Sequence, residues 1–339
     1  MHQKVVIIAE AGVNHNGSLD LARQLVDVAA AAGADYVKFQ TFIAEQNISR
    51  TAQKAAYQVD TTGAAESQLE MVKKLELSRA DHLELIAYCR ERGIKFSSTA
   101  FDTASVEMLD EFNLDFSKVP SGELTNLPFL RQIGALGRPV IVSTGMATLG
   151  EIETALDVLV AAGTARAALT VLHCNTEYPT PMADVNLRAM LTIGQALGVP
   201  IGYSDHTLGI EVPIAAVALG AVCIEKHITL DKNMAGPDHR ASLEPHELTA
   251  MVAAIRNIEA ALGDGRKRPS PSEAPNRLIA RKSVHLAADR PAGHALTAAD
   301  LVMKRPGDGI SPMLVDSLIG RRLRTALSED HKLDPADFA

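Results

Sequence analysis

The sequence lacks most of the features that mark secreted, membrane-spanning or redox-active proteins. It has only three cysteines, Cys89, Cys174 and Cys223, and their spacing fits neither a metal pair nor a redox pair. No apolar run reaches the roughly 18 residues that a membrane-spanning helix needs. Residues 1–4 lead directly into a predicted strand and leave no room for a signal peptide. We therefore expect a cytoplasmic protein with reduced thiols.

Positive charge is also scarce in this chain. It has 33 Lys and Arg against 41 Asp and Glu, which gives a net charge of −8. This balance argues against binding to nucleic acid or to an anionic membrane, although it allows a local basic site for a phosphate. No glycine-rich dinucleotide motif and no phosphate-binding P-loop follows the first predicted strand.

Short apolar runs alternate with longer amphipathic stretches along most of the chain, which is typical of parallel β/α units. Eight strands are predicted, at 5–9, 36–40, 95–98, 116–119, 140–143, 169–174, 201–204 and 222–227. The helices predicted between them include 19–32, 80–92, 149–162 and 245–262, the first with Ser18 as its N-cap and Gly33 as its stop. Eight strands favour an α/β fold of the (β/α)8 TIM-barrel type over an open doubly wound sheet.

Two segments depart from this alternation. Residues 41–77 form a long insertion after the second strand, and loops of this length are usually functional lids or interface pieces. Residues 263–276 contain three prolines and several charges, which predicts a linker. We therefore divide the chain into a barrel domain at 1–264, a linker at 265–280 and a small C-terminal domain at 281–339.

Polar side chains stand at the carboxyl ends of the predicted strands, where the active site of such a barrel forms. Taken singly, each would be read as a solvated loop residue or, for a histidine, as a hydrogen-bonded core residue. Their convergence on one rim favours a catalytic site. They are Glu10, Lys38, Gln40, Thr99, Lys118, Ser121, Glu123, Ser143, Thr176, Tyr178, Ser204, His206, Glu225, Lys226 and His227.

Three lysines in this set indicate the kind of ligand. Lys38, Lys118 and Lys226 lie within otherwise apolar strands, where a buried ammonium group is costly. A bound anion would offset that cost. Lysines combined with Ser and Thr hydroxyls and with exposed glycine amides suit a phosphate and a carboxylate on one small molecule.

Two histidines indicate a metal ion. His206 and His227 end neighbouring strands, so that their rings could share one ion. Two protein ligands with open positions are typical of a catalytic metal rather than a structural one. Imidazole together with oxygen donors favours Mn²⁺, with Mg²⁺ or Co²⁺ as substitutes, and zinc is less favoured because no third protein ligand is evident.

Several longer motifs resemble those of the sialic acid synthase family, whose members condense phosphoenolpyruvate with N-acetylmannosamine or a related hexose. The C-terminal motif KRPGDGI at 304–310 is similar to that of the family's antifreeze-like (SAF) domain. The resemblance runs in order along essentially the whole chain and implies a TIM barrel with a small C-terminal SAF domain. The other matching stretches are AEAGVNHNG at 9–17, VKFQT at 37–41, KVPSGE at 118–123, STGM at 143–146, YPTP at 178–181, GYSDHT at 202–207 and GPDH at 236–239.

The resemblance also implies roles for single residues. Glu10, Glu123 and His206 would be catalytic, with Glu123 between the two substrates, and the metal would be held by His206 and His227. Some members of the family have Asn where this chain has Thr176, and the neighbouring Asn175 could make that contact instead. Phosphoenolpyruvate would be held by Lys38, Thr99, Lys118, Ser121, Ser143, Thr176 and Ser204, and the amino sugar by Glu10, Gln40, Tyr178 and Asp238.

The implied reaction is that of a C–C bond-forming transferase. The metal would polarise the sugar aldehyde as a Lewis acid. The C3 carbon of phosphoenolpyruvate would attack the aldehyde carbon, water would add at C2, and phosphate would leave by C–O cleavage. The lysines would orient phosphoenolpyruvate, and Glu123 would transfer a proton.

The acceptor sugar stays open at this point. N-acetylmannosamine would give N-acetylneuraminate, and 2,4-diacetamido-2,4,6-trideoxymannose would give N,N'-diacetyllegionaminate. These two acceptors differ at C4 and C6 of the hexose.

Other readings also stay open. A Schiff-base pyruvate aldolase could use Lys38 or Lys118 as its nucleophile. Other barrels that condense phosphoenolpyruvate share the chemistry but lack the antifreeze-like tail. A non-enzymatic carbohydrate-binding or ice-binding protein would leave the polar strand ends unexplained.

Arg305 raises the question of partners. On its own it reads as a solvated arginine in a turn before Pro306. The resemblance implies instead a domain-swapped homodimer, in which Arg305 reaches into the partner's barrel and contacts the amino sugar.

Overall fold

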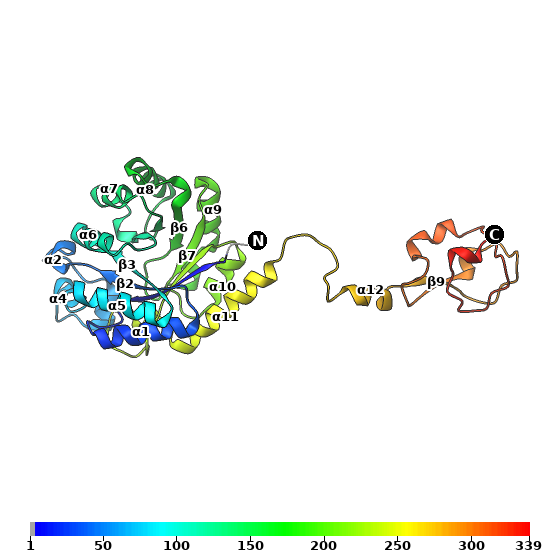
Figure 1. Cartoon of the computed structure of the whole chain (residues 1–339), viewed down its shortest axis with the longest axis horizontal. Helices are drawn as coiled ribbons and strands as arrows, with labels where there is room; N and C mark the ends of the chain where they lie inside the picture. The colour runs from blue at the N-terminus through cyan, green and yellow to red at the C-terminus, as the bar shows by residue number, and fades with distance from the viewer. Residues whose placement is uncertain (1–3) are drawn as a thin grey trace. The chain divides into compact units, whose positions relative to one another are not determined.

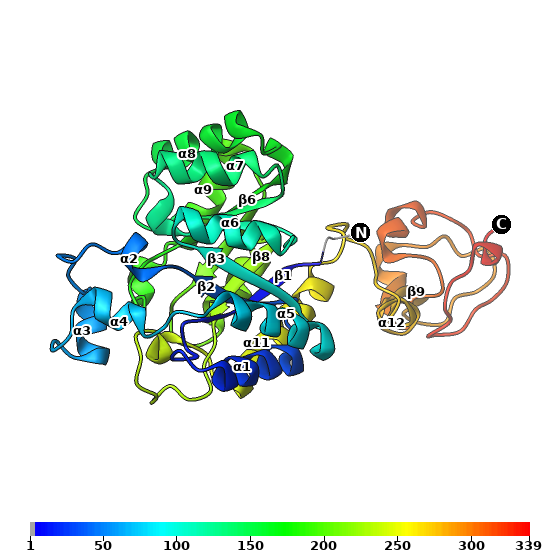
Figure 2. The ribbon, with the colours of Figure 1, turned by 60° about the vertical axis from the view of Figure 1, so that its left-hand side comes forward.

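The computed structural model describes residues 4–339 and contains two compact units, one ending at Gly263 and one spanning Asp264–Ala339 (Figures 1 and 2). The first unit holds eight parallel strands in the order β3-β2-β1-β8-β7-β6-β5-β4. Within the described residues no ladder joins β3 to β4, so the barrel is closed except at this seam, and the predicted (β/α)8 fold is confirmed. The strands are β1 Val6–Gly12, β2 Tyr36–Thr41, β3 Lys95–Ala100, β4 Ser117–Val119, β5 Val140–Ser143, β6 Leu169–Cys174, β7 Ile201–Asp205 and β8 Cys223–His227.

Helices surround this barrel (Figure 1). The first helix begins as predicted, because the Ser18 hydroxyl accepts a hydrogen bond from the Leu21 amide at 3.3 Å. It ends at Gly33, whose φ of 79° is a backbone conformation that glycine adopts without strain. The helices around the barrel are α1 Leu19–Ala32, α5 Arg79–Arg92, α6 Thr103–Glu111, α7 Leu127–Ala135, α8 Leu149–Ala162, α9 Leu187–Leu197, α10 Glu211–Ala218 and α11 Pro245–Leu262.

The inside of the barrel is layered. Its apolar floor is a buried cluster of Ile8, Ile141, Leu172 and Cys223, in β1, β5, β6 and β8, and of Phe116, the residue just before β4. Side chains of a strand alternate between its two faces, so the residue two positions further along points into the barrel again. On these five strands that residue is Glu10, Lys118, Ser143, Cys174 and Glu225. A hydrophobic floor therefore supports a layer that is mostly polar.

The insertion at 41–77 folds into three short helices, α2 Ala44–Asn47, α3 Ala56–Thr62 and α4 Gln68–Lys73. Its first turn is tied to the loop after β3, because the Ile43 amide donates to Asp102 Oδ2 at 2.8 Å. The Ala44 amide donates to Glu76 Oε1 at 2.7 Å, which joins the two ends of the insertion. The insertion is therefore attached to the carboxyl-terminal side of the barrel.

The second unit has its own small core. Strands β9 Ser283–Leu286 and β10 Leu301–Lys304 pair antiparallel. Part of the segment predicted as a linker at 265–280 forms a helix, α12 Ala274–Ala280. The core consists of Val284, Leu286, Leu296, Leu318, Leu323, Leu333 and Phe338.

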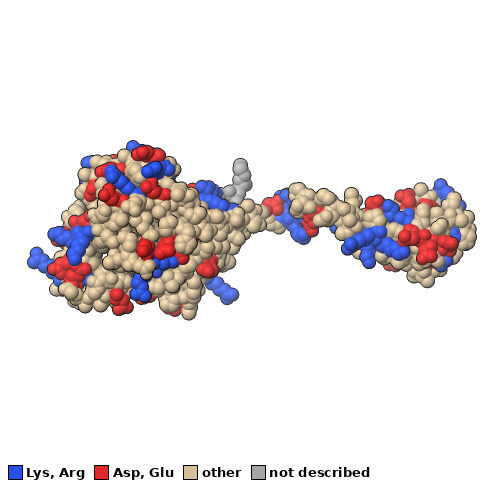
Figure 3. Space-filling view, turned by 90° about the horizontal axis from the view of Figure 1, so that it is seen from below, with Lys and Arg blue, Asp and Glu red and all other residues tan. Residues whose placement is uncertain are grey.

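The surface carries both signs of charge. On the face shown in Figure 3, basic and acidic side chains lie in small neighbouring groups on each unit. Within residues 4–339 no helix is long and apolar enough to cross a membrane.

Candidate active site

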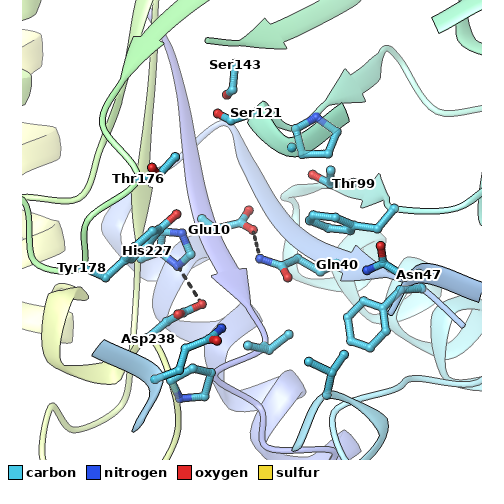
Figure 4. A pocket seen from close by; sticks show the side chains of 18 of the residues that line it. Glu10, Gln40, Asn47, Thr99, Ser121, Ser143, Thr176, Tyr178, His227 and Asp238 are labelled. Atoms are coloured by element: carbon cyan, nitrogen blue, oxygen red, sulfur yellow. Dashed lines mark hydrogen bonds and ion pairs between the residues drawn. The ribbon is translucent and has the colours of Figure 1, made fainter. Parts of the chain in front are cut away.

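A cavity of about 700 Å³ opens at the carboxyl ends of the barrel strands (Figure 4). Strand ends and the loops after them form one part of its wall, and the insertion forms another. The wall includes all the predicted site residues of the barrel unit except Glu123 and Lys226. These wall residues are Glu10, Lys38, Gln40, Thr99, Lys118, Ser121, Ser143, Thr176, Tyr178, Ser204, His206, Glu225, His227 and Asp238.

Two lysines lie at the buried end of the cavity. The Lys38 ammonium contacts Thr99 Oγ1 at 2.8 Å and Glu10 Oε2 at 2.6 Å. The Lys118 ammonium donates to Ser143 Oγ at 2.6 Å. Both lysine side chains are only 3% exposed, so their charges are almost cut off from bulk water.

Glu225 lies between these two lysines and received no predicted role. Its carboxylate is 3.5 Å from the Lys38 ammonium and 3.8 Å from that of Lys118, and it accepts a hydrogen bond from the Ser204 hydroxyl at 3.1 Å. These three partners, Lys38, Lys118 and Ser204, are all residues expected to hold phosphoenolpyruvate. Glu225 could have been found from its spacing, because it is two residues before His227 on the same strand face.

The two buried carboxyls differ in charge. Burial raises the pKa of Glu10 to about 7, which outweighs the opposing effect of the Lys38 charge. Burial also acts to raise the pKa of Glu225, but the charges of Lys118 and Lys38 outweigh it and lower that pKa to about 2. Near neutral pH Glu225 is therefore ionised, whereas burial favours the protonated form of Glu10. Burial also lowers the pKa of Lys118, and an anion bound beside this lysine would stabilise its charged form.

Lys226, which was expected to face a bound anion, does not line the cavity. It alternates with Glu225 and His227 and so points to the outer face of β8. Its ammonium lies 2.5 Å from Asp205 Oδ2 and also contacts the Thr207 carbonyl, and the Lys226 and Asp205 side chains are 0% exposed. The expectation that a bound ligand offsets the charge of Lys226 is therefore wrong, because Asp205 does so.

Hydroxyl groups complete the lysine end of the cavity. Ser121 Oγ accepts a hydrogen bond from the Gly145 amide at 3.0 Å, which orients this serine toward the strand end of β5. Thr176 lines the cavity, whereas Asn175 does not. The side chain of Asn175 instead accepts a hydrogen bond from the Glu177 amide at 2.8 Å. The geometry therefore favours Thr176 over Asn175 as the residue that faces a ligand.

The two histidines lie together, with ring centroids 5.3 Å apart. His206 Nδ1 donates to the Asn175 carbonyl, so its Nε2 carries the lone pair, which accepts a hydrogen bond from the Tyr178 hydroxyl at 3.0 Å. His227 Nδ1 is buried without a hydrogen-bond partner and lies 3.9 Å from Asp238 Oδ2. Burial lowers the pKa of both rings, to about 4 for His206, so both imidazoles are neutral.

These features fit a divalent metal ion. A neutral imidazole with an available lone pair is a metal ligand, and an orphaned buried nitrogen is a place where one belongs. Among residues 4–339 no group of three or more His, Cys, Asp or Glu side chains forms a complete ligand set. The protein would therefore supply the two histidines and leave other positions open, as catalytic sites do.

The predicted acceptor side lies next to the histidines (Figure 4). Gln40 Nε2 is 3.4 Å from Glu10 Oε1, and Tyr178 stacks on His206 with ring centroids 4.1 Å apart. Burial raises the pKa of Asp238 to about 7. This corner therefore offers polar groups that can donate and accept hydrogen bonds.

Glu123 is not one of the residues that line this cavity. Glu123 ends the 3-10 turn Ser121–Glu123, and its carboxylate accepts from Asn126 Nδ2 at 2.5 Å. The role of Glu123 between the two substrates stays a prediction. Arg305 belongs to the second unit, after β10, and its side chain is exposed.

The insertion contributes wall residues that the sequence analysis did not assign. Tyr57 of α3 stacks on Tyr178 with ring centroids 5.2 Å apart, which joins the insertion to the histidine corner. The sequence indicates a helix-like stretch at 66–77 within the insertion but not which of its residues face the barrel. The insertion residues in the wall are Phe42, Asn47, Ile48, Ser49, Ala52, Tyr57, Gln58, Gln68, Met71, Val72 and Leu75.

Known proteins share this combination of domains. Residues 25–267 match the NeuB family and residues 281–339 match the SAF domain. The chain is 52% identical over 328 residues to the N,N'-diacetyllegionaminic acid synthase of Campylobacter jejuni, which covers 97% of this chain and 98% of that protein. It is 45% identical over 324 residues to the protein of the same name from Legionella pneumophila, with 95% and 91% covered.

A solved structure gives the same result. The N-acetylneuraminic acid (sialic acid) synthetase of Leptospira borgpetersenii, in complex with citrate, is 36% identical, with a TM-score of 0.70 over 80% of this chain and 90% of that one. These matches confirm the resemblance and the SAF domain that the motifs indicated.

The different surroundings of the lysines predict different effects on stability. Lys226→Met leaves Asp205 buried without its partner, so the free energy of unfolding should fall by about 3–5 kcal/mol. Lys118→Met should cost less, because Glu225 keeps its contact with Lys38. Urea unfolding followed by circular dichroism measures both. A Lys226→Met chain as stable as the wild type would contradict the structural role of this lysine.

Proposed function

This chain belongs to the NeuB family, and we propose that it condenses phosphoenolpyruvate with an N-acetylated amino hexose and water to give a nine-carbon sialic acid and phosphate. It is then a transferase that forms a C–C bond. The observation that carries this proposal is the pair of buried lysines, Lys38 and Lys118, with only Glu225 and the partly protonated Glu10 to balance them. A phosphate and a carboxylate on one small molecule would complete that balance.

The chain's own residues orient the substrates. Lys38 and Lys118 hold phosphoenolpyruvate at the buried end, with the hydroxyls of Ser121 and Ser143 beside it. Fixing the reacting atoms near one another removes much of the entropic barrier. The C3 carbon then bonds to the aldehyde carbon, water adds at C2, and the C2–O bond breaks to release phosphate. Glu10 and Asp238 are wall carboxyls whose pKa of about 7 lets them hold a proton near neutral pH, whereas Glu123 is not one of the wall residues.

We propose Mn²⁺ as the metal, with Mg²⁺ or Co²⁺ as substitutes, held by His206 and His227. When bound there, the ion would polarise the carbonyl of the open-chain sugar. The neutral rings and the orphaned His227 Nδ1 support this assignment.

We propose 2,4-diacetamido-2,4,6-trideoxymannose as the preferred acceptor, with N,N'-diacetyllegionaminate as the product. The two legionaminic acid synthases at 52% and 45% identity support this choice over N-acetylmannosamine. Phosphate release from phosphoenolpyruvate with each acceptor, measured side by side, tests it. Release that depends on an acceptor supports the function, and no release with either sugar contradicts it.

The metal assignment predicts a matched set of results. EDTA should abolish phosphate release and Mn²⁺ should restore it. His206→Ala and His227→Ala should each lose Mn²⁺ binding in calorimetry as well as turnover, whereas the exposed His246→Ala should keep both. Activity that survives EDTA, together with borohydride trapping of a pyruvate adduct, would support the Schiff-base aldolase instead.

We also propose a cytoplasmic, domain-swapped homodimer in which Arg305 of one chain completes the sugar site of the other. The Arg305 side chain is exposed, and within residues 4–339 it pairs with no acidic group. Its neighbour Lys304, in contrast, lies 2.6 Å from Asp330. A guanidinium left free in this way is available to a sugar or a partner.

The homodimer predicts complementation between inactive chains. Arg305→Ala and His206→Ala, refolded together, should regain part of the activity, because some mixed dimers contain one intact site. A chain that carries both substitutions is the control and should stay inactive. If mixed dimers form and remain inactive, Arg305 does not act in the partner's barrel.

A further inference from the structure

The cavity has one wall that differs in chemistry from the lysine end. Val13, Phe42 and Leu75 are buried against one another, and Val72 and Phe101 pack on them. All five side chains line the cavity. We call these five residues the apolar wall. Such a surface does not favour a sugar hydroxyl group. A hydroxyl that contacts it loses its hydrogen bonds to water without gaining others, which is energetically unfavourable.

The apolar wall is made by the barrel and the insertion together. Val13, Phe42 and Phe101 each follow one of the neighbouring strands β1, β2 and β3. Val72 lies in α4 and Leu75 just after it, both within the insertion. The wall therefore sits on the ends of three adjacent strands and is completed by the segment that distinguishes this chain from a plain barrel.

Two amides of the insertion lie in the same cavity. Gln68 is the first residue of α4 and Asn47 is the last residue of α2, and both line the cavity. Within residues 4–339 neither side-chain amide has a hydrogen bond to another residue. A side-chain amide has both a donor and an acceptor, which match the carbonyl and the N–H of an acetamido group.

The two acceptor sugars differ in the groups that this part of the cavity can recognise. N-acetylmannosamine carries hydroxyls at C4 and C6, whereas 2,4-diacetamido-2,4,6-trideoxymannose carries an acetamido group at C4 and a methyl group at C6. Transfer of a methyl group from water to an apolar surface is favourable, and transfer of a hydroxyl without a partner is not. The apolar wall and the free amides therefore match the second sugar.

Building on the proposed function, we infer that the apolar wall and Gln68 determine acceptor specificity. The wall receives the C6 methyl and an acetamido methyl, and the Gln68 amide bonds an acetamido group. The insertion at 41–77 is then the part of the chain that selects the sugar, while the barrel binds phosphoenolpyruvate.

The test measures kcat/KM for both acceptors in the full-length enzyme, with phosphoenolpyruvate saturating and Mn²⁺ present. Val72→Thr replaces one methyl by a hydroxyl at nearly constant volume on a half-buried residue, so the fold should survive. Since one methyl in an apolar pocket discriminates by roughly 10-fold or more, preference for the trideoxy sugar should fall about 10-fold. Gln68→Leu should also lower that preference.

Val59→Thr is the matched control, because Val59 lies in α3 of the same insertion but outside the cavity wall. Its acceptor preference should equal that of the wild type, and the KM for phosphoenolpyruvate should be unchanged in all three variants.

The possible outcomes separate the two proposals. If the wild type releases phosphate with neither acceptor, the proposed function itself fails. If it releases phosphate but prefers N-acetylmannosamine, the inference is overturned and the function stands. The same conclusion follows if Val72→Thr and Gln68→Leu leave the ratio of the two kcat/KM values unchanged.

Discussion

Two ammonium groups buried inside the barrel need negatively charged partners, and the rest of the site is arranged around this need. Lys38 and Lys118 are each 3% exposed, and a charge in such a place is costly unless it is paired. Glu225 pairs with both, and Glu10 pairs with Lys38 while its raised pKa leaves it partly protonated. The site keeps its positive character because its own carboxylates do not cancel it.

The barrel makes this arrangement possible by stacking layers. The apolar floor excludes water below the lysines, and the alternation of side chains places polar groups one step above it. The same alternation sends Lys226 to the outer face, where Asp205 neutralises it. The insertion and the ends of β1, β2 and β3 together form an apolar wall, and the insertion adds two unpartnered amides to a cavity whose other end is charged. Each substrate thus meets a surface of matching chemistry.

Much of this could be predicted from the sequence, and the exceptions have physical reasons. The eight strands, the barrel and most of the wall residues follow from apolar runs that end in polar side chains. Lys226 was misassigned because its residue type was considered without the face to which the strand alternation directs it. Glu123 ends a 3-10 turn that the motif does not reveal, and its role between the substrates stays a prediction. The insertion's contribution depends on tertiary packing, since its short helices have no period that relates them to the barrel.

The most direct test of the role of the buried lysines is a calorimetric measurement of the affinity of phosphoenolpyruvate for the wild type and for Lys118→Met. Loss of a hydrogen bond to a charged group costs about 1.5–3 kcal/mol, and each 1.4 kcal/mol is tenfold in affinity. We expect Lys118→Met to bind phosphoenolpyruvate at least roughly tenfold more weakly than the wild type, while the KM for the sugar changes little. Equal affinity in the two proteins would contradict the claim that the buried lysines form the anion site.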